Sequence, residues 1–141
     1  MVLRCKDGES KSLVFPVLFK TSILMFGSTA LAALFMKHSV NKILLALYFF
    51  GDTTSILNHG MNSRLAQRLD RIVMAVGACC DVYYMKNITD KKYFGICVAS
   101  FLSSISSYFI SKIFLKSRIV FHASAHFWVT VLHTTQLFVQ K

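Results

Sequence analysis

The sequence has few charged residues, and acidic ones are especially scarce. Of its 141 residues only 16% are charged, Asp and Glu together number 6, and there is a single proline. Soluble domains carry charge on about a quarter of their residues, so this chain has too little charge to cover a soluble surface of its size. The composition therefore excludes an ordinary soluble domain.

Cysteine motifs and a signal peptide are also missing. The four cysteines stand at positions 5, 79, 80 and 97, without the C-x2-C spacing of a zinc ribbon. The neighbouring pair Cys79 and Cys80 falls inside an apolar run, where packing is its simplest role. The first 12 residues are polar and no cleavage site follows a short apolar core, so a cleavable signal peptide is not expected. The redox compartment stays undetermined.

The residues that are abundant are apolar. Hydrophobic residues make up 55% of the chain, and its mean hydropathy is +0.54. One membrane crossing takes roughly 20 residues, so each apolar run counts as one crossing. The sequence predicts an all-α, polytopic transmembrane helix bundle, a single domain over 1–141 with a polar tail at 1–12. The predicted spans are 13–36, 43–57, 72–84, 93–114 and 119–139, with a loop at 60–71.

Basic residues lie between these runs rather than in one patch. There are 16 Lys and Arg, spread in twos and threes along the chain. This distribution suits anionic headgroups and not nucleic acid. Nine of them fall in the tail and in the loops at 60–71 and 112–118, against six on the opposite side. We therefore expect a multi-pass integral membrane protein whose N-terminus is cytoplasmic.

Two pairs of polar side chains have the spacing of one helix turn. Ser55 and His59 form one pair, and His122 and His126 form the other, so each pair shares a helix face. Asp70 lies at the start of the third span. Five crossings place His59, Asp70 and His122 on the same membrane side, which we predict to be cytoplasmic.

These residue types suit a catalytic zinc centre. Zinc takes three protein ligands and keeps a fourth position for water, whose pKa falls to about 7. His59, His122 and His126 would be the ligands, and Asp70 would accept or orient the proton of the attacking water. Ser55 would donate a hydrogen bond to the oxyanion. At a membrane the accessible carbonyls belong to lipids, so a lipid amide or ester is the expected substrate.

The motif Ser55-x3-His59, Asp70 within Arg-Leu-Asp-Arg, and His122-x3-His126 followed by Phe-Trp resembles a known superfamily. That superfamily contains the alkaline ceramidases, the adiponectin-receptor-like proteins and the hemolysin III proteins. The resemblance implies zinc on the three histidines, with Asp70 and Ser55 at the reacting centre, and a ceramidase-like hydrolase. Its members have seven spans, whereas this chain has five.

Other interpretations stay open. The chain could be a receptor-like or accessory protein with a structural zinc, because five spans leave little room for a substrate, and two chains could pair as a homo-oligomer. It could also bind haem b through His59 and a histidine of the last span. His133 is expected to meet Asp52 or Asp81 rather than the zinc, and these two carboxylates lie deeper in the bilayer, paired or protonated.

Overall fold

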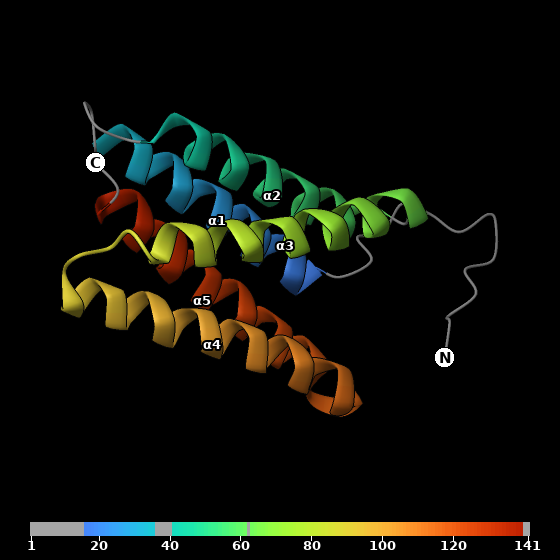
Figure 1. The fold of residues 1–141 in the computed structure, drawn as a ribbon. Helices are drawn as coiled ribbons and strands as arrows, with labels where there is room; N and C mark the ends of the chain where they lie inside the picture. Colours follow the sequence, from blue (N-terminus) through green and yellow to red (C-terminus); the bar gives the residue numbers. More distant parts are fainter. Residues whose placement is uncertain (1–15, 36–40, 62, 140–141) are drawn as a thin grey trace.

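The computed structural model describes residues 16–35, 41–61 and 63–139, and all the regular structure in them is helical, as predicted. The helices alternate in direction and lie side by side (Figure 1). They are α1 (Pro16–Phe35), α2 (Lys42–Gly60), α3 (Arg64–Met85), α4 (Lys91–Ile113) and α5 (Arg118–Val139), with a short 3-10 turn at Leu115–Ser117 before α5. The predicted tail at 1–12 and Cys5 lie outside the described residues.

Three helix starts follow from capping side chains. The Asn41 side chain accepts from the backbone N–H groups of the first turn of α2, and Asp90 does the same for α4. Ser63 accepts from the backbone N–H of Ala66 at the start of α3. Such caps satisfy N–H groups that have no partner inside the helix. Helices that are neighbours in the sequence run antiparallel (Figure 1).

The predicted loop at 60–71 is wrong. Helix α2 continues to Gly60, and α3 begins at Arg64, directly after its cap Ser63. Arg, Leu, Ala and Gln all favour helices, so the polar character of this segment reflects an exposed helix face and not a loop. Asp70 consequently lies in the second turn of α3, and the third helix is much longer than the predicted 72–84.

The helices lie in the spatial order α3, α2, α1, α5, α4, and each packs mainly against its neighbours in this order. Gly60, at the end of α2, lets α1 come close: a Cβ there would lie 2.8 Å from the ring of Phe19. A larger residue would require the Phe19 ring to move. The end of the bundle where α1 begins and α2 ends is thus tightly packed.

The interior of the bundle is unusually polar. Among the described residues, 14 polar or charged side chains are buried, against 11 apolar ones. The exterior carries 28 exposed large apolar side chains, spread over all five helices. Two helices, α1 and α4, are long and apolar enough to cross a membrane. The other three carry nine of the 14 buried polar side chains, including all the buried histidines and carboxylates.

Candidate metal centre

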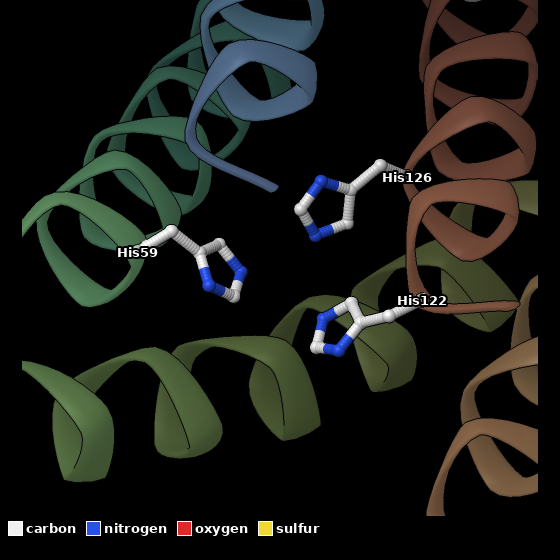
Figure 2. A group of neighbouring side chains, drawn as sticks. All are labelled: His59, His122 and His126. Atoms are coloured by element: carbon white, nitrogen blue, oxygen red, sulfur yellow. The ribbon is translucent and has the colours of Figure 1, made fainter. Parts of the chain in front are cut away.

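Three histidines meet at one end of the bundle. His59 is next to the last residue of α2, and His122 and His126 lie in the first turns of α5. Figure 2 shows the three rings pointing into one space, one from α2 and two from α5. Each histidine offers one ring nitrogen, and these three nitrogens all lie within 4.8 Å of one another. All three residues are buried. This cluster could hold a metal ion.

The hydrogen bond to Thr21 assigns the tautomer of His126. The Thr21 hydroxyl donates to the carbonyl of Leu18 and lies 2.9 Å from Nδ1 of His126. If the single hydroxyl hydrogen lies on the Leu18 carbonyl, the Thr21 oxygen accepts from Nδ1–H of the imidazole. Nε2 of His126 is then unprotonated and available as a ligand, which is how metal-binding histidines are usually oriented.

The donor set fits a tetrahedral metal. Zinc binds imidazole nitrogens at about 2.0–2.1 Å, which separates two ligands by about 3.4 Å, and the 4.8 Å limit is close to this. Side-chain rotations that bring the nitrogens about 1.4 Å closer would give the separation that zinc requires. Nδ1 of His122 is buried and has no hydrogen-bond partner in the described part of the chain. A buried polar atom without a partner calls for an explanation, and a bound ion provides one.

Asp70 lies beside the histidines but is not part of the cluster. Its carboxylate is buried and accepts a hydrogen bond of 2.6 Å from the side-chain amide of Asn58, the neighbour of His59. A cavity of about 60 Å³ is lined by Asp70, His59 and His122 together. Space of this size holds water molecules. Asp70 can therefore face water in the cavity that two of the histidines also face.

Ser55 is one turn from His59, as predicted, but it faces α1. Its hydroxyl lies 3.0 Å from the hydroxyl of Ser22, which itself donates to the carbonyl of Leu18. The Ser55 hydroxyl is thus paired with Ser22, and Ser55 does not line the cavity. The structure does not bring it together with Asp70, and its role as an oxyanion donor stays a prediction.

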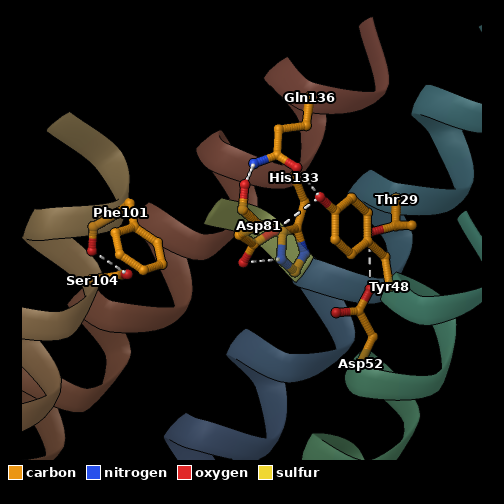
Figure 3. A network of polar contacts seen from close by, with 8 residues as sticks. All are labelled: Thr29, Tyr48, Asp52, Asp81, Phe101, Ser104, His133 and Gln136. Carbon is orange, nitrogen blue, oxygen red and sulfur yellow. Dashed lines mark hydrogen bonds and ion pairs between the residues drawn. The ribbon is translucent and has the colours of Figure 1, made fainter. Parts of the chain in front are cut away.

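A second polar network lies deeper in the bundle (Figure 3). His133 meets Asp81 at 3.6 Å, as expected, and its ring stacks on Tyr48. The Tyr48 hydroxyl donates to Asp81 at 3.0 Å and also bonds to Gln136. Asp52 accepts from Thr29 at 2.8 Å. Tyr48, Asp81, His133 and Gln136 join α2, α3 and α5, and the bond from Thr29 to Asp52 joins α1 to α2. His133 stands apart from the three clustered histidines.

Sequence reasoning missed three neighbours of the site. Asn58 stands next to His59 in the sequence, so its position could have indicated that it lies near the site. Thr21 gave no signal, because only the packing of α1 against α5 brings it to His126. Tyr108, whose ring centroid lies 5.6 Å from that of His122, gave none for the same reason.

Comparison with known proteins adds no assignment. No protein family model matches this chain, and no curated protein and no solved structure matches it significantly.

The tautomer assignment makes Thr21 testable. Thr21→Val removes the acceptor for Nδ1–H of His126 at nearly constant volume, and such partners are typically worth about 10- to 100-fold in metal affinity. We expect zinc affinity, measured by competition with a chelating dye, to fall within this range. The control is Thr53→Val, because exposed Thr53 bonds only to a carbonyl of its own helix. Equal affinities in the two variants would contradict the assignment.

Proposed function

We propose that this chain is a membrane-embedded, zinc-dependent hydrolase that acts on a lipid amide such as ceramide. The observation that carries the proposal is the buried cluster of His59, His122 and His126 beside the carboxylate of Asp70, at one end of the bundle. The resemblance of Ser55-x3-His59, Asp70 and His122-x3-His126 to the alkaline ceramidases and their relatives supports the same assignment.

The distribution of polar side chains supports a membrane location for all five helices. A polar interior with an apolar exterior reverses the pattern of soluble proteins, and intramembrane polar groups face the bundle interior. The helices alternate in direction, so the cluster belongs to the membrane side on which α1 begins. The bias of Lys and Arg assigns that side to the cytoplasm.

Zinc is the metal that the donor set favours, because three imidazoles are typical of catalytic zinc sites. When bound, zinc lowers the pKa of a coordinated water to about 7 and so supplies a nucleophile at neutral pH. Asp70 supplies a proton acceptor in the same cavity, held in place by Asn58. His126 is oriented by Thr21. The chain thus offers ligands, a general base and positioning groups in one place.

The position of the site favours a lipid substrate. The cluster lies near helix ends, where the carbonyl groups of lipids meet the headgroup region, and the helices around it expose apolar side chains such as Leu69 and Ile119. An acyl chain can lie against this surface while its amide carbonyl enters the cavity. A lipid ester would fit the same arrangement.

A second function has an observation of its own. The cavity of about 60 Å³ is far smaller than the pockets of about 300–1,000 Å³ that enclose small molecules. A receptor-like or accessory protein with a structural zinc needs no larger space. The same small volume opposes haem, because a porphyrin is far larger than this cavity.

Metal content and turnover, measured on one preparation, test the proposal. We expect about one zinc per chain, as a single three-histidine site requires, and release of fatty acid from fluorescent N-acyl lipids in detergent or nanodiscs. The panel compares ceramides, other N-acyl lipids and esters. Zinc without turnover of any of these would favour the structural alternative, and a purified chain without zinc would contradict both.

A further inference from the structure

Three basic side chains surround the cavity beside the histidines. Arg71 comes from α3, Lys112 from the end of α4 and Arg118 from the start of α5, and all three line the cavity. Of the described residues that line it, Asp70 is the only acidic one. Basic residues from three separate helices thus converge on one small space.

The electrostatic balance of this space is strongly positive. Lys112 and Arg118 are close enough for their charges to act on both His59 and His122. Arg71 and Lys112 act in the same way on Asp70. A divalent metal on the histidines would add two further positive charges, while Asp70 contributes one negative charge. An anionic ligand beside Arg71, Lys112 and Arg118 would offset this positive charge.

Membrane anchoring alone does not explain where these side chains lie. Arg64 and Arg68 belong to the same end of the bundle, yet neither lines the cavity. The ammonium group of Lys112, by contrast, lies over the ring of Tyr108, 4.6 Å from its centroid. This is within the limit of about 6 Å for a cation–π interaction. The Tyr108 ring in turn meets His122 edge to face. Lys112 is therefore directed toward the site.

We propose that the site recognises a lipid whose anionic group, a phosphate or a similar acid, lies close to the carbonyl to be cleaved. Arg71, Lys112 and Arg118 bind the anionic group while the carbonyl faces the histidine cluster. The preferred substrate is then a phosphorylated N-acyl lipid rather than a neutral ceramide. Cleavage of this lipid rests on the proposed hydrolase function, whereas its binding does not.

Binding can be measured without turnover. The probes are a short-chain ceramide, its 1-phosphate and inorganic phosphate, titrated into the full chain in nanodiscs, with zinc and after chelation. We expect the phosphorylated lipid to bind about 10- to 100-fold more tightly than the neutral one, roughly the effect of one charge-assisted hydrogen bond. The preference should persist in part after chelation, because the basic side chains remain.

Substitutions distinguish the three basic residues from their neighbours. Arg71→Gln, Lys112→Gln and Arg118→Gln should each weaken binding of the phosphorylated lipid about tenfold or more and leave binding of the neutral lipid unchanged. Arg64→Gln and Arg68→Gln are the matched controls and should bind as wild type. An equal loss in the controls, or equal binding of the two lipids by wild type, would overturn the proposal.

Two further measurements keep the test decisive. If a Gln variant does not fold, the salt dependence of the wild-type chain replaces it: affinity for the phosphorylated lipid should fall as salt rises, and affinity for the neutral lipid should not. Inorganic phosphate binding as tightly as the phosphorylated lipid would make free phosphate the ligand and overturn the lipid assignment. Selective binding without any hydrolysis would retain this inference and remove the hydrolase function.

Discussion

Replacing His122 or His126 with alanine should abolish zinc binding and weaken the whole bundle. Each histidine provides one of three ligands, and both belong to α5, whereas the third ligand, His59, belongs to α2. The metal therefore links two helices that otherwise touch little. Zinc in structural sites contributes about 10–16 kcal/mol of apparent binding free energy, so its loss outweighs most single side-chain effects.

The measurements are zinc per chain after purification and the melting temperature with and without a chelator. We expect both alanine variants to melt at the temperature of the chelated wild-type chain and to be insensitive to the chelator. His133→Ala is the matched control, because His133 lies on the same helix but pairs with Asp81 in the deeper network. It should keep its zinc even if it is less stable. Normal zinc content in His122→Ala and His126→Ala would exclude the site described above.

The histidine cluster was predictable because its geometry is mostly local. His122 and His126 share a face through their spacing alone, and the alternation of helix directions places His59 and Asp70 at the same end. Neither step needs the angle at which two helices cross. The prediction of an all-helical chain rests on the same periodic signal and is confirmed for the described residues.

Contacts that depend on helix rotation were not predictable. A shift of one residue turns a side chain by 100° around its helix, and the sequence alone does not say which face of α1 meets α5. That rotation determines the contact of Thr21 with His126 and the contact of Ser55 with Ser22. The loop predicted at 60–71 failed for another reason: charged residues were interpreted as a loop, although Ser63 and the residues after it form a capped helix start.

The placement of Asp70 in α3 gives the second large prediction. Asp70→Asn keeps the size of the side chain and can still accept the hydrogen bond from Asn58 through its remaining carbonyl oxygen. It removes only the capacity to accept a proton at this point. Positioned proton transfer is typically worth about 100- to 10,000-fold in rate, so lipid hydrolysis should fall by at least the lower value. Zinc content and melting temperature should stay near those of the wild-type chain.

The combination of readouts separates three roles for Asp70. A general base loses turnover alone, a zinc ligand loses metal and turnover together, and a structural partner of Asn58 loses stability first. Asp81→Asn serves as the control, because Asp81 is equally buried on the same helix but bonds to Tyr48, away from the cavity. If Asp70→Asn hydrolyses lipid at the wild-type rate, Asp70 is not the base, and water in the cavity must pass its proton to another group.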